Sequence, residues 1–144
     1  MITKKAEYAI IILTELASHP ERSRITSKEI ACNRAIPVNL VVQLLSLLNE
    51  AGWTSGSRGP AGGIKLNIDP AEINLRQVIE KVDGPVAITR CLLYDTPCQN
   101  KAFCSLRKVW SKAQVSMLSV LEEVSIKDLA NEEPASLHKS NLSS

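Results

Sequence analysis

The strongest constraint on the fold is a pair of helix signals joined by a short turn, between residues 26 and 50. The stretch "TSKE", residues 26–29, matches a capping box, in which a Thr hydroxyl and a Glu carboxylate each pair with an amide at the start of a helix. It predicts a short helix from Ser27 to Asn33. "RAIP" then predicts a turn, and Pro37 suits the first turn of a longer helix, because its missing N–H would be unpaired there anyway. Two helices in this order indicate a helix–turn–helix.

A glycine-rich hairpin is expected after the second of these helices. That helix should run to about Glu50, end at a left-handed Gly52, and turn four leucines inward: Leu40, Leu44, Leu47 and Leu48. Two β-capable runs, residues 53–57 and 64–67, flank a loop that contains Gly59, Pro60, Gly62 and Gly63. A hairpin placed directly after a helix–turn–helix is a wing.

Further helical signals complete a mainly α fold, a winged helix–turn–helix with a small β-hairpin wing plus a long C-terminal helix. Residues 4–18 have helical spacing, and residues 74–84 begin at a capping Asn74 and stop at Gly84. "SIKDLA" predicts a final short turn. The long helix, over about residues 103–124, carries one apolar stripe: Leu106, Trp110, Ala113, Met117, Leu121 and Val124.

This pattern divides the 144 residues into four segments. Residues 1–84 form the expected winged helix–turn–helix domain, and residues 85–104 form a loop rich in cysteine. Residues 105–130 form the long helix and the terminal turn. Residues 131–144 have the composition of a disordered tail.

Charge is distributed unevenly along the chain. Residues 1–66 carry eight Lys or Arg against five Asp or Glu, whereas residues 120–144 carry two against five. A basic N-terminal domain favours an anionic partner. Glu7 and Glu15 interrupt the first apolar stretch, and no apolar run reaches about 18 residues. We therefore expect no signal peptide, no membrane contact and a cytoplasmic location.

The helix–turn–helix supplies the candidate DNA-binding residues. The second helix of such a motif enters the major groove with its first residues, which here are Pro37, Val38, Asn39, Val42 and Gln43. The amides can pair with adenine, and the valines can contact thymine methyl groups. Ser27 and Lys28 are placed to bind phosphate. In the wing, an Arg on a thin loop suits a narrow minor groove, and the residues are Arg58, Gly59 and Gly62.

Each of these features, taken singly, also occurs in proteins that do not bind DNA. A capping box is common, "RGPAGG" is also a sequence for a tight turn, and exposed amides are ordinary surface residues. Their order along one basic segment is what favours DNA binding.

Three of the four cysteines lie in "CLLYDTPCQNKAFC", residues 91–104, with the spacing C-x6-C-x5-C. In a reducing cytosol, such a group more often indicates metal or redox chemistry than a structural disulfide. Structural zinc sites favour shorter spacings, so zinc is a poorer match. The fourth cysteine, Cys32, stands alone in "EIACNRA". We expect it to be a buried, hydrophobic residue, with a ligand or redox role as the alternative.

Several stretches resemble the Rrf2 family of bacterial winged-helix transcription regulators: "KKAEYAI", "SKEIA", "QLLSLLNEAG", "SRGPAGG", "INLRQVIEKVDGPV" and "TRC". The resemblance covers roughly residues 1–130. Members of this family are homodimers in which the long C-terminal helices cross and the two wings meet a palindromic operator. The resemblance therefore implies a dimer contact formed by Leu106, Trp110, Ala113, Met117 and Leu121, for which a core helix within one subunit is the alternative.

The same resemblance implies that Cys91, Cys98 and Cys104 hold an iron–sulfur cluster, with two or four irons. In the cluster-bearing branch each gap most often has five residues, whereas the first gap here has six. One branch completes its site with a His three residues after the last cysteine, but Arg107 occupies that position here and does not bind iron.

A nitric-oxide-sensing branch completes its site with an acidic residue from the first helix of the partner subunit. Glu7 stands at the matching place, so the resemblance implies Glu7 of the partner subunit as the fourth ligand. The alternative is an exposed Glu7 paired with Lys4 or with a nearby Arg. His19 and His138, the two histidines of the chain, are expected on the surface.

The expected function is that of a transcription regulator, a repressor, which senses redox state, nitric oxide or iron and cluster status through this cluster. The alternatives are a cluster-free thiol switch, in which the cysteines form a disulfide or persulfide, and a zinc-containing regulator. An enzyme is not expected, because the chain has no C-x-x-C, no phosphate-binding glycine loop and no His near a nucleophile.

Overall fold

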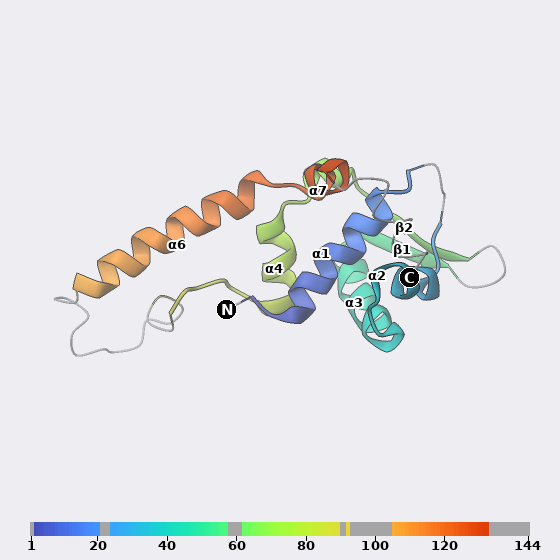
Figure 1. Cartoon of the computed structure of the whole chain (residues 1–144), viewed down its shortest axis with the longest axis horizontal. Coiled ribbons are helices and arrows are strands. Elements are labelled where there is room, and N and C mark those ends of the chain that lie inside the picture. The colour runs from blue at the N-terminus through green and yellow to red at the C-terminus, as the bar shows by residue number, and fades with distance from the viewer. Residues whose placement is uncertain (1, 21–23, 58–61, 90–91, 93–104, 133–144) are drawn as a thin grey trace.

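The computed structural model describes residues 2–20, 24–57, 62–89, 92 and 105–132. Its elements are α1 (Lys4–Ala17), α2 (Ser27–Arg34), α3 (Val38–Glu50), β1 (Thr54–Ser57), β2 (Gly63–Leu66), η1 (Pro70–Glu72), α4 (Leu75–Asp83), α6 (Ser105–Glu123) and α7 (Ile126–Glu132). Figure 1 shows most of them gathered into one body, with the hairpin at one end and α6 extending from the other. The described chain is mainly helical with a two-stranded antiparallel hairpin, which confirms the predicted fold class.

Side-chain caps define where two of the helices begin. Thr26 Oγ1 accepts from the Glu29 amide at 3.1 Å, and Glu29 Oε2 accepts from the Thr26 amide at 3.0 Å. The predicted capping box is therefore present, and α2 ends at Arg34, one residue later than predicted. Asn74 and Gln77 form a second reciprocal pair at the start of α4, with both distances at 2.9 Å. Such caps pair the amides that a helix leaves free at its N-terminus.

The hydrophobic core lies where α1 packs against α3, α4 and α7. Its fully buried side chains come from all four helices and include Ile12, Leu13, Leu44, Leu48, Val78 and Ile126. Within the described chain, every buried hydrophobic residue is aliphatic. The body therefore has a continuous core of its own.

The inward face of α3 differs slightly from the prediction. Leu44 and Leu48 are buried as expected, but Leu40 and Leu47 are only partly buried. The other buried positions of the helix are Val41 and Leu45. Within the described residues, no single helix has the length and apolar character needed to cross a membrane. The pair α2 and α3 meets that test only when taken together, and it is bent by 118° at the break.

The end of the described chain is tied back to the core. The Ile126 amide donates to the Ile73 carbonyl at 2.9 Å, and the Leu75 amide donates to the Val124 carbonyl at 3.0 Å. Ile126 is fully buried, and α7 packs against α1 and η1. The predicted short turn is therefore a helix that is anchored in the body.

The wing is a hairpin that is attached to the helix–turn–helix through β2. β1 and β2 pair antiparallel, with Ser57 opposite Gly63 at the end where the two strands are connected. Ile25, which precedes α2, pairs with Ile64 through two backbone hydrogen bonds of 2.9 and 2.7 Å. The wing and the start of α2 are therefore held together by backbone pairing.

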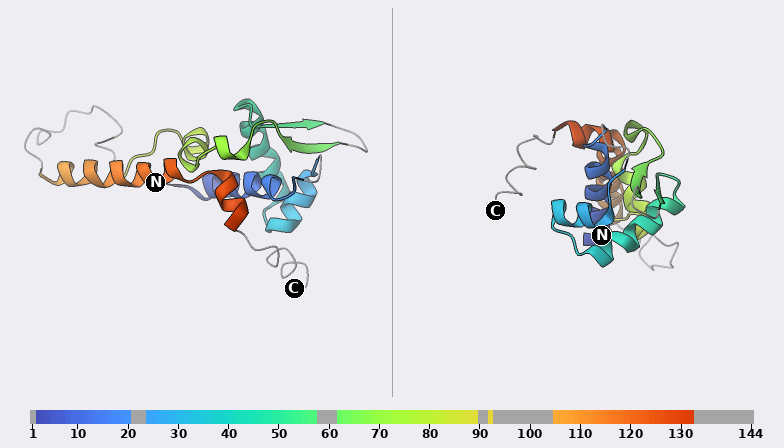
Figure 2. Two further views of the ribbon diagram at one scale, coloured as in Figure 1. Left: turned by 90° about the horizontal axis from the view of Figure 1, so that it is seen from above. Right: turned by 90° about the vertical axis from the view of Figure 1, so that its right-hand side faces the viewer.

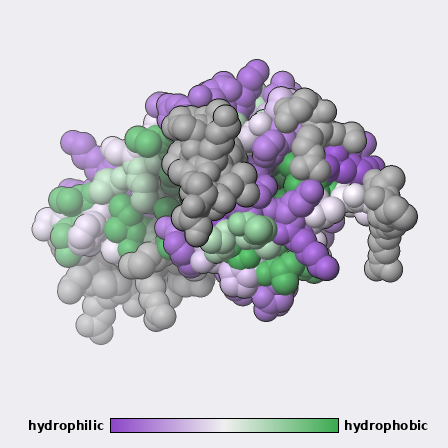
Figure 3. All heavy atoms as spheres, turned by 45° about the vertical axis from the view of Figure 1, so that its right-hand side comes forward, coloured by the Kyte–Doolittle hydropathy of each residue, from purple (hydrophilic) through white to green (hydrophobic). Residues whose placement is uncertain are grey.

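α6 extends from the body as an arm that contacts α4 (Figure 2). Its 19 residues span about 28 Å, and although all of them are described, none is buried. In Figure 3, hydrophobic side chains are exposed on the receding left-hand part of the molecule, where α6 extends. Arg76 of α4 pairs with Glu80 at 2.9 Å and also with Glu122 near the end of α6. α6 is therefore not a core helix within its own subunit.

Candidate nucleic-acid interface

One face of α3 is exposed along the length of the helix, and we call it the outer face of α3. Val38 is 45% exposed and Val42 is 54% exposed. The polar residues on this face are Asn39, Gln43, Ser46 and Asn49. The opposite face is buried because apolar residues recur there at spacings of three and four. The α3 residues predicted to enter the major groove therefore share one accessible surface.

Pro37 precedes α3 instead of occupying its first turn. Its φ of −56° and ψ of 131° are not helical. Its carbonyl accepts from the amides of Leu40 and Val41 at 3.0 and 3.1 Å. The predicted position was therefore wrong by one residue, because Pro37 has an extended ψ. Pro37 is exposed beside Val38 and borders the outer face of α3.

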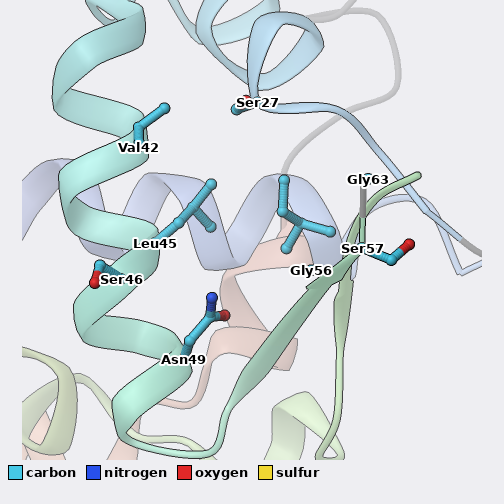
Figure 4. Close-up of a pocket in the computed structure, with 9 residues that line it drawn as sticks. Ser27, Val42, Leu45, Ser46, Asn49, Gly56, Ser57 and Gly63 are labelled. Atoms are coloured by element: carbon cyan, nitrogen blue, oxygen red, sulfur yellow. The ribbon is translucent and has the colours of Figure 1, made fainter. Parts of the chain in front are cut away.

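Ser27 and Lys28 form the first turn of α2, next to the outer face of α3. Their positions follow from the capping box, which starts the helix at Ser27. Lys28 is exposed and Ser27 is half-buried. Figure 4 shows Ser27 and Val42 on opposite sides of a cavity. The two residues predicted to bind phosphate are thus close to those predicted to contact bases.

This cavity, of about 370 Å³, lies between α3, the start of α2 and the wing (Figure 4). Asn49 Oδ1 accepts from Thr54 Oγ1, so the amide NH₂ of Asn49 is the group that can donate. The other polar residues of the lining are Ser27, Ser46 and Ser57. Hydroxyl and amide donors of this kind bind phosphate oxygens. Sequence analysis missed Ser46 and Asn49, although they continue the outer face four and seven positions after Val42.

The wing requires a glycine where it meets the segment before α2. Gly63 has a φ of 144°, and a Cβ there would lie 3.1 Å from the Ile25 carbonyl oxygen and from Arg24 Cβ. Arg24 Nη1 also donates to the Gly63 carbonyl at 3.2 Å. Gly62 is half-buried beside it. The other two residues predicted for the minor groove, Arg58 and Gly59, lie outside the described residues.

A buried carboxylate holds α2 against α1. The Glu15 side chain has no exposed surface and accepts from Arg34 Nε at 2.5 Å and from Asn33 Nδ2 at 3.1 Å. His19 Nε2 lies 2.9 Å from the same carboxylate. Burial alone would raise the pKa of Glu15, but hydrogen bonds from Arg34, Asn33 and His19, together with the charge of Arg34, outweigh it and lower that pKa. The helix–turn–helix is thereby fixed to α1 by an ion pair.

Two residues lie in environments that differ from those expected. Cys32 is exposed with a free thiol, whereas we expected it to be buried. In α2, which is described throughout, Ile30 is the buried residue, and a side chain two positions later points to the other side of the helix. His19 was expected on the surface but is 24% exposed, because it packs over the carboxylate of Glu15.

Glu7 lies in the first turn of α1 and is 53% exposed. Its carboxylate is 3.0 Å from Lys4 Nζ, and this hydrogen bond and charge raise the pKa of Lys4. The pairing is the one expected for an ordinary surface residue. The exposure also leaves the carboxylate accessible to a second molecule.

The start of α1 lies beside the segment that leads into the cysteine loop. A cavity of about 290 Å³ is lined by Ile2, Met117 and residues 86–88. Thr3 donates to the Asp83 carboxylate through its amide at 2.9 Å and through its hydroxyl at 2.5 Å. The N-terminal end of α1 is thereby joined to the end of α4.

The three clustered cysteines, Cys91, Cys98 and Cys104, lie outside the described residues. Among the residues that are described, no group of three or more His, Cys, Asp or Glu side chains could hold a metal ion.

The residues predicted for the dimer contact lie on α6, and none of them is fully buried in its own subunit. Leu106 is 54% exposed and Ala113 is exposed. Trp110, Met117 and Leu121 are half-buried. Val109 and Val120, each 59% exposed, extend the same apolar stripe and were not predicted.

A helix–turn–helix with an accessible second helix and an attached wing defines a winged-helix transcription regulator. The sequence profile of the Rrf2 family, described as "Iron-dependent Transcriptional regulator", matches residues 2–132. The chain therefore belongs to the Rrf2 family, whose members are transcription regulators and not enzymes.

Individual relatives agree with this assignment. The chain is 31% identical over 137 residues to an rrf2-like HTH-type transcriptional regulator of Rhodobacter capsulatus, covering 90% of this chain and 91% of the relative. It is 30% identical over 128 residues to the HTH-type transcriptional regulator IscR of Aliivibrio salmonicida, covering 89% of this chain and 76% of IscR. The solved structure of CymR, the global cysteine regulator of B. subtilis, has a TM-score of 0.78 at 25% identity and covers 93% of this chain and 98% of CymR.

Proposed function

We propose that this protein is a cytoplasmic repressor that binds a palindromic operator in double-stranded DNA as a homodimer. The outer face of α3, with Pro37 at its start, enters the major groove. The observation that carries this proposal is the exposure of that face beside a cavity bounded by the wing. Such a cavity would accommodate the sugar–phosphate backbone between the two grooves, with Ser27 and Lys28 binding phosphate. Arg58, Gly59 and Gly62 of the wing then reach the adjacent minor groove.

The homodimer forms through α6 in this proposal. The apolar stripe of α6 is only partly covered in its own subunit, and a second copy of the same helix would bury the rest. Residues 1–84 serve as the DNA-binding domain, residues 85–104 as the cysteine loop, residues 105–130 as the dimerisation segment and residues 131–144 as a disordered tail. α7 packs on α1, so the third segment returns to the DNA-binding domain.

The signal enters through an iron–sulfur cluster held by Cys91, Cys98 and Cys104, with Glu7 of the partner subunit as the fourth ligand. The donor set fits, because thiolates hold such clusters and one of them can be replaced by another ligand. The accessible carboxylate of Glu7 supports this assignment, as does the position of the start of α1 beside residues 86–88. When bound, the cluster would supply a group whose state changes with redox conditions, nitric oxide or iron supply.

α1 connects the proposed cluster site to the helix–turn–helix. Glu7 is in its first turn, and Glu15 follows eight residues later, about 12 Å along the helix. Glu15 is paired with Arg34 of α2 at 2.5 Å. A shift of α1 would therefore move α2, and with it the orientation of α3 on the operator.

The test is the visible absorption spectrum of anaerobically purified full-length protein, with iron and acid-labile sulfide assayed on the same sample. We expect a brown protein with iron and sulfide in similar amounts. Cys98→Ala should lose the colour and the iron while its far-ultraviolet circular dichroism stays unchanged. Cys32→Ala is the matched control and should keep both, because Cys32 lies on the exposed side of α2. Full iron content in Cys98→Ala would remove that residue from the site.

A cluster-free thiol switch is the second candidate. The observation that favours it is the similarity of this chain to CymR, which is described as a cysteine regulator. In that case an oxidant joins two of the thiols of Cys91, Cys98 or Cys104 as a disulfide, or a sulfane-sulfur donor converts one of them to a persulfide, and DNA binding changes. A zinc-containing regulator is the remaining variant. A colourless, iron-free protein that still binds DNA would favour these candidates, and a zinc assay would separate them.

A further inference from the structure

The outer face of α3 carries two parallel rows of unlike side chains. Val38 and Val42 form an apolar row, and Asn39 and Gln43 form an amide row beside it. Within each row the residues are four positions apart, which is about 6 Å along the helix. All four side chains are exposed. The sequence of α3 contains no Lys or Arg.

Such a surface distinguishes base pairs by amide hydrogen bonds and methyl contacts, not by charge. The commonest specific contact to guanine uses the donors of Arg or Lys, which α3 lacks. An Asn or Gln amide has both a donor and an acceptor, so it matches the N6 and N7 edge of adenine. An apolar side chain fits the C5 methyl group of thymine. The two rows therefore match the two bases of an A·T pair.

The spacing of the rows also fits stacked base pairs. Residues four positions apart are separated by about 6 Å along the helix, and successive base pairs are separated by about 3.4 Å. When the helix lies along the groove, equivalent contacts fall about two base pairs apart. Val38 with Asn39 would contact one pair, and Val42 with Gln43 would contact the pair two steps away.

We propose that α3 selects A·T base pairs, with Val38 and Val42 against thymine methyl groups and with Asn39 and Gln43 on adenine edges. This inference rests on the proposed DNA-binding function and adds the chemistry of the bases that are recognised. Affinity for the backbone then comes from residues beside α3. Lys28 is exposed next to this face and supplies a positive charge for phosphate.

The test begins with the anaerobically purified full-length protein and a library of duplexes with a random core. In an enriched duplex, each thymine of the half-site is replaced in turn by deoxyuridine, which removes only the C5 methyl group. Each adenine is replaced in turn by 7-deazaadenine, which removes the N7 acceptor. We expect half-sites with A·T pairs two positions apart. The Kd should rise about fourfold at each contacted thymine and roughly fivefold or more at each contacted adenine.

Variants of the outer face assign each effect to a residue. Val42→Ala should raise the Kd severalfold and abolish the sensitivity to deoxyuridine at one thymine. Val115→Ala is the matched control, because it removes the same atoms from a side chain that is 67% exposed on α6. Val115→Ala should leave the Kd and the sensitivity to deoxyuridine unchanged. Gln43→Arg should move the preference at one position from A·T to G·C, since Arg can donate to guanine O6 and N7.

The outcomes separate this inference from the proposed function. Enriched duplexes that bind tightly but tolerate every deoxyuridine and 7-deazaadenine would overturn the inference and leave DNA binding intact. Half-sites dominated by G·C pairs opposite α3 would overturn it as well. Failure to enrich any duplex would overturn the proposed function, and the inference with it.

Discussion

The winged body and α6 differ in where they bury their apolar side chains. In the body, α1, α3 and α7 bury Ile12, Leu48 and Ile126 completely. In α6, all 19 residues are described and none is buried, and Leu106 and Val115 are more than half exposed. The body therefore contains its own hydrophobic core, whereas the apolar residues of α6 keep much of their surface exposed.

The body and α6 therefore have different structural roles within one small chain. The body fixes the outer face of α3 and the wing relative to each other through the core, the Ile25–Ile64 pairing and the Glu15–Arg34 ion pair. α6 is tied to the body near its C-terminal end, where Arg76 pairs with Glu122. A second copy docked on α6 would therefore set the distance between two DNA-binding surfaces without altering either one.

The largest effect is expected from truncating the core of the body. Leu48 is fully buried, so Leu48→Ala should lower the free energy of unfolding by about 2–5 kcal/mol, measured by urea denaturation. Leu106→Ala removes the same atoms from an exposed position on α6 and serves as the control. The loss of unfolding free energy in Leu106→Ala should be clearly smaller. Equal losses in the two variants would remove the contrast between the body and α6.

The next effect concerns the buried ion pair of the body. Glu15→Gln removes a fully buried carboxylate charge that pairs with Arg34 and should cost roughly 3 kcal/mol at neutral pH. The folded-state pKa of Glu15 is lowered from its ordinary value of 4.5, so its contribution is present above that pH and is lost as the pH falls through the folded-state pKa. The stability curves of wild type and variant should therefore converge in acid.

Glu7→Gln provides the control for that measurement. Glu7 is 53% exposed and pairs with Lys4 at the surface, so its substitution should change stability by less than about 1 kcal/mol. A gap between wild type and Glu15→Gln that stays constant from neutral to acid pH would show that the charge of Glu15 does not stabilise the body.

A smaller effect is expected at Gly63, where the wing meets the segment before α2. Gly63→Ala places a Cβ 3.1 Å from the Ile25 carbonyl oxygen at a φ of 144°, and it should cost about 1–3 kcal/mol. It should also weaken binding of the enriched duplex, because the wing shifts relative to α3. Gly56→Ala is the matched control, since its Cβ would lie 3.8 Å from the nearest atom, the Gly63 carbonyl oxygen. Similar melting curves for both variants would contradict the close approach at Gly63.

The smallest change in free energy is expected for a substitution on α6. It should affect the formation of the dimer and not the folding of the subunit. Leu106→Ala should raise the dimer dissociation constant roughly tenfold, which corresponds to about 1.4 kcal/mol of lost apolar burial. Val115→Ala, on the other side of the helix, should leave that constant unchanged. Sedimentation velocity across a dilution series measures both. An unchanged constant for Leu106→Ala would place the dimer contact elsewhere.

The ends of several elements could be predicted from sequence because they depend on neighbouring residues. The Thr26 capping box joins groups three positions apart, and Gly52 and Gly84 have the positive φ that suits the end of a helix. The outer face of α3 follows from the spacing of its apolar residues. These are local rules, and the fold class they predicted is confirmed.

The environments of single side chains could not be predicted in the same way. Cys32 is exposed because the rest of the body covers the Ile30 side of α2, which depends on tertiary packing. Glu15 seemed only to interrupt an apolar stretch, yet it is the buried anchor of α2. The cavity beside α3 also requires the Ile25–Ile64 pairing, which joins residues far apart in the sequence.

The most direct test of this account is the molar mass of the full-length protein by sedimentation equilibrium at micromolar concentration. A helix that buries none of its residues in its own subunit predicts a species of twice the 15.7 kDa of one chain. That species should bind one duplex with two half-sites. A stable species of 15.7 kDa that binds the same duplex with undiminished affinity would contradict the account.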